Sequence, residues 1–374
     1  MRIGILTFSH SDNYGAMLQA YGLKSYICSL NNQTFIIPYA PPYLVGRHWL
    51  IPYIPQADKW KQVKSAYKST IYNLSTIIDF HRQRKRMKTF RNKYLTNNAK
   101  SIKRAKTLKH LKIDYLIVGS DQIWNSDITL GLRKEFFGVF SPKISCKVIA
   151  YAASIGNDVL PESYREEIKK LLENVDIISM RERSSIPYIS SLTSKQITDV
   201  MDPIFLLSVD QWKLIESIPC QYPYILVYVT ESNQELNNFI QELSKEKNLP
   251  IIQIKRNKAV SLSPSFKWNA CTGPSDFLGY IHYAQYVVTN SFHATAFSIL
   301  FHKQFLIFNH SSRNARLKDL LFNCDLENRI FDKSLATTQI DNPIDWNQTE
   351  QKKEKAIRYS KEFLQRSLAI NEEI

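Results

Sequence analysis

A histidine placed just after an apolar strand is the side chain of this sequence best positioned to do chemistry. Residues 286–288 are apolar, residues 289–291 form a polar turn, and His293 follows in the first turn of an expected helix. The amino end of a helix carries unpaired N–H groups and partial positive charge, so it attracts anions. A histidine there can contact a phosphate or move a proton. A histidine that merely packs against the strand tip fits the same pattern.

Polar residues and small turn residues also follow the other expected strands. They are Ser9, His10, Asn13, Tyr14 and Gly15 after residues 2–8, Gly119, Ser120, Asp121, Gln122, Trp124 and Asn125 after residues 115–118, Ser154, Ile155 and Gly156 after residues 147–151, and Arg181, Glu182 and Arg183 after residues 177–180. Parallel strands end at one edge of a sheet, so this set predicts a catalytic cleft that contains an anion-binding arginine and a carboxylate. Two structural alternatives remain: Asp121 as a helix N-cap and Arg181 in an ion pair with Glu182.

Strand and helix patterns alternate in two successive halves of the chain. The expected strands are residues 2–8, 34–38, 115–118, 147–151 and 177–180, and then, after Asp202-Pro203, residues 224–229, 250–254, 286–288 and 305–308. The expected helices are residues 16–30, 162–172, 233–245, 273–284, 317–322 and 349–368. This alternation predicts an α/β fold of two Rossmann-like doubly wound domains in tandem, with a ligand cleft between them.

The same pattern sets the expected domain boundaries. Residues 1–203 are predicted to form the N-terminal domain, with a helical basic and aromatic insertion at about 40–112. Residues 204–345 are predicted to form the C-terminal domain. Residues 346–374 are predicted to form a C-terminal helix that packs back on the N-terminal domain.

Composition narrows the functional class. The 374 residues are 44% hydrophobic, enough for two cores. Five scattered cysteines without metal-ligand spacing argue against disulfides and a zinc site. No signal peptide or membrane-spanning run is apparent, which favours the cytoplasm. With 10 glycines and no GxGxxG or Walker-type loop, an NAD enzyme or a P-loop nucleotidase is not expected.

Much of the formal charge of +15 is concentrated in one segment. Residues 81–112 contain 13 lysines and arginines and no aspartate or glutamate, and the segment just upstream carries Tyr43, Trp49, Tyr53 and Trp60. Aromatic residues beside basic ones suit an anionic membrane surface. Nucleic-acid binding and a merely solvated helix face are the alternatives.

Six short blocks, in order along the chain, resemble motifs of the polysaccharide pyruvyl transferase family. They are Asn13–Tyr21, Val118–Asn125, Tyr151–Gly156, Ser179–Glu182, Met201–Pro203 and Thr289–His293. The resemblance implies a two-domain fold of the GT-B type. It also implies a transferase that moves pyruvate from phosphoenolpyruvate to a sugar, usually as a cyclic ketal. Carried onto this sequence, the family's donor-binding arginine is Arg181 and its catalytic histidine is His293.

Two departures from the family pattern affect the donor site. Many members have glycine after the histidine, where this chain has Ala294, and some have arginine two residues before it, where this chain has Ser291. The expected donor-binding set is therefore Arg181, Ser291, Phe292, His293, Arg313 and Arg316. Asp121 is the candidate base. The expected acceptor-binding set is Asn13, Tyr14, Gly15, Ser120, Gln122, Trp124 and Asn125.

The expected product is a 4,6-ketal on a hexose such as galactose in a capsular or other extracellular polysaccharide precursor. Phosphoenolpyruvate is the co-substrate, and no metal, other cofactor or nucleic-acid partner is expected. A polyprenyl diphosphate acceptor would be reached at the inner membrane face, where the basic insertion could dock. Two alternatives stay open: a GT-B glycosyltransferase that uses a nucleotide sugar, and a non-catalytic polyanion-binding protein.

Overall fold

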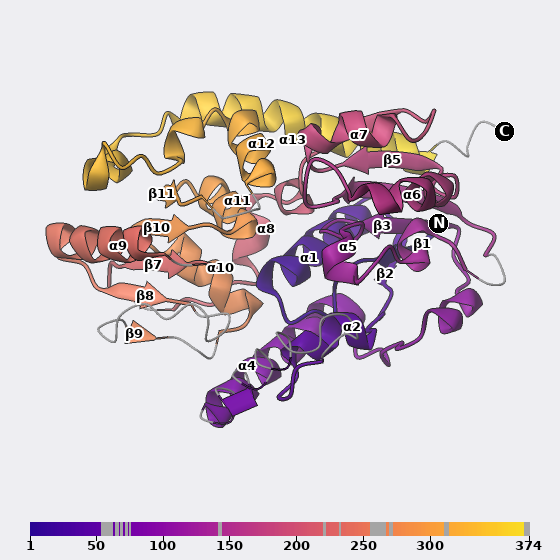
Figure 1. Cartoon of the computed structure of the whole chain (residues 1–374), viewed down its shortest axis with the longest axis horizontal. Helices are drawn as coiled ribbons and strands as arrows, with labels where there is room; N and C mark the ends of the chain where they lie inside the picture. The colour runs from indigo at the N-terminus through magenta and orange to yellow at the C-terminus, as the bar shows by residue number, and fades with distance from the viewer. Residues whose placement is uncertain are drawn as a thin grey trace. The chain divides into compact units, whose positions relative to one another are not determined.

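The computed structural model describes residues 1–53, 63, 67, 70–71, 74, 76–140, 144–219, 222–231, 233–254, 267–268, 272–309 and 314–369. The chain forms two compact units (Figure 1). Unit 1 comprises Met1–Thr70, Lys88–Leu207 and Glu354–Ile374, and unit 2 comprises Ile71–Met87 and Ser208–Lys353. The chain passes from unit 1 to unit 2 between residues 207 and 208, four residues beyond the expected domain boundary. Residues 71–87, which were expected to belong to the insertion in the N-terminal domain, belong to unit 2.

Unit 1 is built on a six-stranded parallel sheet in the order β2-β1-β3-β4-β5-β6. Its strands are β1 (Arg2–Leu6), β2 (Gln33–Ile36), β3 (Tyr115–Gly119), β4 (Lys147–Ala153), β5 (Ile177–Met180) and β6 (Ile197–Asp199). The strand β3 is apolar along its whole length, and β1 and β4 are apolar after their first residues, Arg2 and Lys147, as expected of a parallel sheet covered on both faces. In register, Ile3 of β1 pairs with Thr34 of β2 and Tyr115 of β3.

Helices follow most strands of unit 1. They are α1 (Tyr14–Ser29), α2 (Pro42–Val45), α5 (Ser126–Thr129), α6 (Arg165–Leu172) and α7 (Ile186–Ser190), with short helical turns η1 (Gly46–His48), η2 (Arg91–Thr96), η3 (Ala105–His110), η4 (Lys134–Phe137), η5 (Glu162–Tyr164), η6 (Arg183–Ser185) and η7 (Pro203–Leu206). The helix α4 (Ile77–Phe90) contributes its first eleven residues to unit 2. The insertion expected at about residues 40–112 is therefore helical at least over α4.

The last two thirds of the C-terminal helix α13 (Trp346–Ala369), from Glu354 onward, belong to unit 1. The Tyr115 hydroxyl donates to the carbonyl of Leu368 (3.2 Å), and the backbone N–H of Met201 donates to Ser360 Oγ (2.9 Å). These bonds tie the helix to the start of β3 and to the segment after β6.

Unit 2 contains a five-stranded parallel sheet in the order β11-β10-β7-β8-β9. Its strands are β7 (Ile225–Tyr228), β8 (Ile251–Gln253), β9 (Lys267–Trp268), β10 (Tyr286–Thr289) and β11 (Gln304–Ile307). Its helices are α8 (Val209–Lys213), α9 (Gln234–Lys247), α10 (Pro274–His282), α11 (Phe292–Leu300) and α12 (Ala315–Cys324), with turns η8 (Glu327–Arg329) and η9 (Ala336–Asp341). One face of α9, including Phe239 and Leu243, packs in a core with Ile225 and Val227 of β7.

Both sheets reverse their winding direction once. In unit 1 the reversal lies between β1 and β3, and in unit 2 it lies between β7 and β10. Loops diverge at such a switch point, so the carboxyl ends of the two strands leave a crevice in which α/β proteins bind ligands. These two strand pairs therefore locate the candidate site within each unit.

The strands and helices predicted from the sequence are confirmed, with ends shifted by a few residues. The prediction missed β6 and β9, which have only three and two residues. No helix in the described part of the chain is long and apolar enough to span a membrane.

Candidate active site

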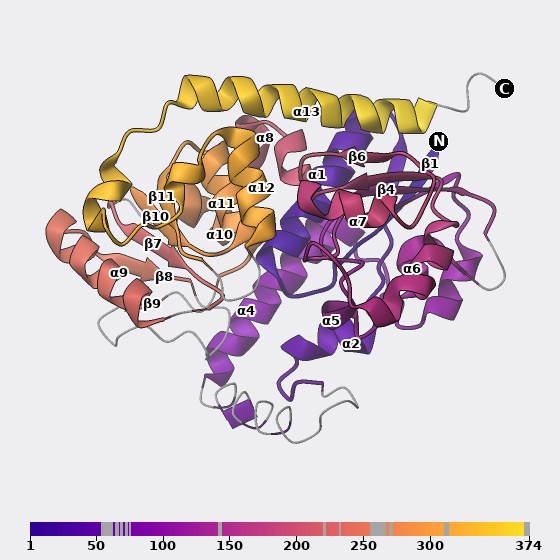
Figure 2. The ribbon, with the colours of Figure 1, turned by 45° about the horizontal axis from the view of Figure 1, so that its top comes forward.

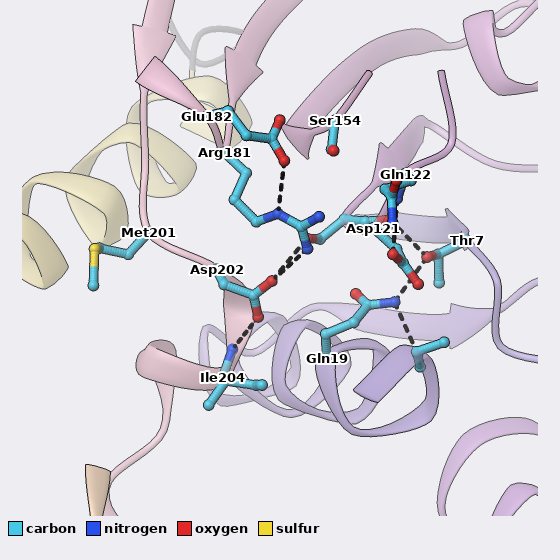
Figure 3. A network of polar contacts seen from close by, with 12 residues as sticks. Thr7, Gln19, Asp121, Gln122, Ser154, Arg181, Glu182, Met201, Asp202 and Ile204 are labelled. Atoms are coloured by element: carbon cyan, nitrogen blue, oxygen red, sulfur yellow. Dashed lines mark hydrogen bonds and ion pairs between the residues drawn. The ribbon is translucent and has the colours of Figure 1, made fainter. Parts of the chain in front are cut away.

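Hydrogen bonds join the β1 and β3 loops at the switch point of unit 1 (Figure 3). The Thr7 hydroxyl donates to the backbone carbonyl of Ser120 (3.0 Å). Gln19 of α1 donates through Nε2 to Thr7 Oγ1 (2.9 Å) and to the carbonyl of Ala16 (2.9 Å). Thr7, Gln19 and Ser120 are fully buried. The predicted block around residue 120 is therefore held by side chains from the start of the chain.

Arg181 is the centre of a buried charge cluster in the same unit. Its Nη1 lies 2.9 Å from Asp202 Oδ2, and its Nε lies 3.3 Å from Glu182 Oε1. Burial alone would lower the pKa of Arg181, but the surrounding carboxylates of Glu182 and Asp202 raise it instead, and the carboxylate of Asp121 adds to this effect. Arg181 thus carries its positive charge at every working pH, with two carboxylates already against it.

Asp202 was not predicted as a site residue, although its Met-Asp-Pro block was recognised. Its Oδ2 accepts from Ser120 Oγ (3.3 Å), and its Oδ1 accepts from the backbone N–H of Ile204 (3.0 Å). It therefore links Arg181, the β3 loop and the start of η7. The only sequence signal for this linking role was that Asp202 belongs to the Met201–Pro203 block.

Asp121 lies in the β3 loop with a left-handed backbone, at φ 72°. Its Oδ1 accepts from the N–H of Gln122 (2.8 Å), and its side chain is largely buried. The helix that follows is capped instead by Asn125, whose Oδ1 accepts from the N–H groups of Asp127 and Ile128. The N-cap alternative for Asp121 is therefore wrong, and its role as a base stays a prediction.

The residues predicted to bind the acceptor hold the local structure in several places. Asn13 caps α1 by accepting from the N–H groups of Gly15 and Ala16. Asn125 donates to Gln122 Oε1 (2.8 Å). Trp124 is fully buried, stacks on Phe137 at 4.9 Å and donates its Nε1–H to the carbonyl of Phe136.

Tyr14 and Gly15 are also buried in the first turn of α1. For all seven residues of the expected acceptor-binding set, acceptor binding stays a prediction.

His10 is a buried polar residue that follows β1 and was not predicted as a catalytic or binding residue. Its Nδ1 lies 3.3 Å from Ser9 Oγ. Arg91 donates to the backbone carbonyls of Ser9 and His10 and pairs with Asp12. Burial, assisted by the charge of Arg91, lowers the pKa of His10 to about 3. The imidazole is therefore neutral at physiological pH. The only feature of the sequence that pointed to His10 was its position just after the first strand.

The switch point of unit 2 is tied together by Asn290. Its Oδ1 accepts from the N–H (2.7 Å) and the hydroxyl (3.2 Å) of Thr230, and its Nδ2 donates to the carbonyl of Glu231 (2.7 Å). These contacts join the β7 loop to the β10 loop. The N–H of Ser291 donates to Thr289 Oγ1 (3.0 Å), which fixes the turn into α11.

His293 occupies the first turn of α11, as predicted. It is nearly buried, and its ring meets the Phe292 ring edge to face at 5.3 Å between centroids. Ser291 is the N-cap position, and its carbonyl accepts from the N–H and the hydroxyl of Thr295. The anion-attracting end of α11 therefore lies at the crevice of unit 2.

Arg316, in the first turn of α12, places its guanidinium 6.0 Å from the centre of the Phe292 ring. Within unit 2 the structure thus brings a positive charge close to the residue next to His293. Arg313, the other arginine of the predicted donor set, lies outside the described residues. The described residues contain no group of three or more His, Cys, Asp or Glu side chains that could hold a metal ion.

The comparison with known families bears on these blocks directly. Residues 13–312 match the family described as Polysaccharide pyruvyl transferase. The chain belongs to this family. It is accordingly a transferase of polysaccharide biosynthesis, and the matched range contains all six blocks that the sequence suggested, from Asn13 to His293. No curated protein matches the transferase.

Solved structures resemble the transferase in fold. The UDP-GlcNAc 2-epimerase of Methanocaldococcus jannaschii is 11% identical with a TM-score of 0.52, covering 99% of this chain and 100% of the other. The UDP-GlcNAc 2-epimerase of Neisseria meningitidis is 10% identical with a TM-score of 0.51, covering 99% and 100%. At this identity the likeness concerns the fold, which is of the GT-B type, as predicted.

Proposed function

We propose that the transferase moves the pyruvyl group of phosphoenolpyruvate onto two hydroxyls of one sugar and forms a cyclic ketal. The observation that carries the proposal is the position of the family blocks. The blocks Asn13–Tyr21 and Val118–Asn125 follow β1 and β3, the two strands at the switch point of unit 1, and the block with His293 lies at the switch point of unit 2. The crevice at a switch point is the usual ligand site of such sheets.

The proposed reaction begins with a proton that adds to C3 of the donor, which leaves positive charge on C2. One sugar hydroxyl attacks C2 and loses its proton, giving a tetrahedral adduct that still carries the phosphate. The C2–O bond to phosphate then breaks, and the second hydroxyl bonds to C2. Of the two protons that the hydroxyls lose, one balances the proton placed on C3 and the other leaves on the phosphate.

Unit 2 offers the groups for the phosphate and the first proton. The amino end of α11 supplies a positive field for the phosphate. Ser291 is the N-cap of this helix, and Phe292 is its first residue. In the proposal His293 acts there as the acid, and Arg316 adds a cation 6.0 Å from the centre of the Phe292 ring. A histidine in such a field serves both binding and proton transfer.

Unit 1 offers Arg181 and Asp121. In the proposal Arg181 binds the donor carboxylate, with Asp202 and Glu182 fixing the orientation of its guanidinium. Asp121, on the loop beside it, removes a proton from an attacking hydroxyl. Asn13, Gly15, Ser120, Gln122 and Asn125 shape the loops that would receive the sugar. The reaction as written requires no metal and no further cofactor.

The acceptor we propose is a hexose such as galactose, bridged at its 4- and 6-hydroxyls, in a capsular or other extracellular polysaccharide precursor. Precursors of this kind are assembled on a polyprenyl diphosphate at the inner face of the cell membrane. A lipid-linked acceptor therefore goes together with a protein that works in the cytoplasm at that surface. Nucleic acid has no part in this proposal.

A phosphate-release assay with phosphoenolpyruvate and a panel of sugar acceptors tests the function. We expect acceptor-dependent phosphate release and a product whose mass rises by one pyruvyl ketal. His293→Gln should reduce the rate about 100-fold or more, as loss of a general acid does. Ser298→Ala, in the same helix, removes only a hydroxyl that bonds the carbonyl of Ala294 and should keep wild-type activity.

Two outcomes would refute the proposed reaction or the role of His293, and a third outcome would refute catalysis altogether. One is the absence of phosphate release with every acceptor, together with a thermal shift from a nucleotide sugar but none from phosphoenolpyruvate. This result would indicate a glycosyltransferase. The other is a His293→Gln protein that is folded and fully active, which would remove the histidine from the mechanism. Salt-sensitive polyanion binding without any transfer would indicate a binding protein.

A further inference from the structure

Exposed apolar side chains gather in one short part of the chain. Among the described residues, 18 large hydrophobic side chains are exposed, and nine of these fall between residues 49 and 78. They are Trp49, Ile51, Tyr53, Val63, Tyr67, Ile71, Leu74, Ile77 and Ile78. Scattered exposed apolar residues are ordinary, but a concentration of this kind indicates an interaction surface.

Four of them lie close together in the sequence within unit 2. Ile71, Leu74, Ile77 and Ile78 are 38–63% exposed. Ile77 and Ile78 open α4, and Ile71 and Leu74 are helical residues that precede the turn at Thr76. These four residues, called here the apolar face, are apolar side chains that unit 2 itself leaves uncovered.

Basic residues follow the apolar face in the sequence along α4, the helix labelled in Figure 2. Arg82 and Lys85 are exposed and fall on the same side of the helix by their spacing from Ile78. Arg84 lies over the Phe80 ring at 5.6 Å. Arg86 is already paired with Asp276 of the same unit at 2.6 Å. Within Ile77–Phe90, Asp79 is the one acidic residue.

We propose that the apolar face and the basic residues Arg82 and Lys85 dock the protein on an anionic lipid bilayer. Isoleucine and leucine enter the boundary between headgroups and acyl chains, and the cations that follow meet lipid phosphates. The positive charge of this surface favours an anionic bilayer over a second copy of the protein. Two copies of a protein with a formal net charge of +15 would repel each other here. The inference rests on the proposed function, since a lipid-linked acceptor places the substrate at such a bilayer.

The test uses the full-length protein and vesicles of phosphatidylcholine with or without phosphatidylglycerol. We expect cosedimentation with the phosphatidylglycerol vesicles that weakens at high salt and is weak on phosphatidylcholine alone. The double variant Leu74→Asp/Ile78→Asp should lose about tenfold or more in affinity, because charge opposes insertion of the helix. Arg82→Glu/Lys85→Glu should lose the dependence on phosphatidylglycerol.

Leu214→Asp is the matched control, since Leu214 is 82% exposed in unit 2 but far in sequence from the apolar face. It should bind vesicles as the wild type does. Wild-type affinity of the Leu74→Asp/Ile78→Asp protein would overturn the proposal. So would a change from dimer to monomer in that variant with vesicle binding intact, which would identify a self-association surface.

A soluble acceptor separates this inference from the proposed reaction. The Leu74→Asp/Ile78→Asp protein should transfer pyruvate to a soluble acceptor at the wild-type rate and lose activity only on an acceptor embedded in vesicles. Vesicle binding without any transfer would refute the reaction and leave docking supported. Transfer without vesicle binding would refute docking alone.

Discussion

Arg181 and Asp202 form an ion pair with 2.9 Å between Nη1 and Oδ2, and both side chains are at most 2% exposed. One residue follows β5 and the other follows β6, so the pair joins two chain segments at the carboxyl edge of the sheet. Ser120 also donates to Asp202, which connects the pair to the β3 loop. The orientation of the arginine therefore depends on a residue 21 positions away in the sequence.

Replacing Asp202 with alanine should destabilise unit 1 by about 3–5 kcal/mol, because it leaves the Arg181 charge buried beside a single carboxylate. Asp202→Asn should be milder, since the amide can still accept from the Ile204 N–H. Urea denaturation measures both. The control is Arg366→Ala, which removes an exposed i,i+4 pair with Glu362 and should change stability by less than about 1 kcal/mol. Equal effects of Asp202→Ala and Arg366→Ala would contradict the prediction.

Gly156 permits the β4 loop to pass close to the β3 loop. Its φ is 81°, and a Cβ there would lie under 3.0 Å from Asn125 Nδ2 and Gln122 Oε1. Gly156→Ala should therefore cost stability through both strain and overlap, in total about 2–4 kcal/mol. It should also lower transferase activity, because Asn125 and Gln122 must move. Calorimetry and the phosphate-release assay measure the two effects.

Gly131 offers a matched control for that substitution. Its φ is 92°, but a Cβ there would meet only the Tyr164 hydroxyl, at 3.8 Å. Gly131→Ala therefore carries the backbone strain without the overlap and should cost about 1 kcal/mol. A Gly156→Ala protein no less stable than Gly131→Ala would show that the loops adjust freely.

The fold was predictable from the sequence because its strands are continuous apolar runs that end in polar turns. Runs such as residues 115–118 and 286–288 leave little freedom in the type of element or in its position. The short edge strands β6 and β9 lack that pattern, since tertiary pairing with β5 and β8 defines them. The transfer of residues 71–87 to unit 2 depends on packing across a long sequence separation, which no local pattern encodes.

The candidate site was predictable only in part. The helical position of His293 followed from its turn, whereas the packing of Trp124 and Tyr14 in the interior of unit 1 did not. Both belong to family blocks, and a block does not separate residues that shape a loop from residues that face a ligand. The ion pair of Arg181 with its neighbour Glu182 was among the alternatives that the sequence offered, and the structure contains it. The second partner, Asp202, could not be read from spacing, because it comes from a different strand connection.

His10 should make the stability of unit 1 sensitive to acid. Its folded-state pKa of about 3 lies below the ordinary value of 6.5, because burial and Arg91 disfavour the charged imidazole. As pH falls below 6.5 the unfolded chain takes up a proton that the folded chain refuses, so stability is lost from there down toward pH 3. At pH 5 the loss is about 2 kcal/mol.

Urea denaturation of wild type and His10→Gln at pH 7 and pH 5 measures this effect. The glutamine does not titrate, so the variant should lose about 2 kcal/mol less than the wild type between the two pH values. The exposed His81→Gln variant is the control and should follow the wild type. Identical pH responses of wild type and His10→Gln would show that burial of the imidazole does not resist its protonation.

Arg316 should contribute to donor affinity more than to the chemical step. Its guanidinium lies 6.0 Å from the Phe292 ring centre, next to the helix end that we assign to the donor phosphate. Loss of a charged hydrogen bond is worth about 1.5–3 kcal/mol, so Arg316→Ala should raise KM for phosphoenolpyruvate about 10- to 100-fold with a smaller change in kcat. Lys318→Ala, an exposed cation on the same helix, should leave KM unchanged. If Arg316→Ala keeps the wild-type KM while remaining folded, the phosphate is held elsewhere, and α12 has no part in donor binding.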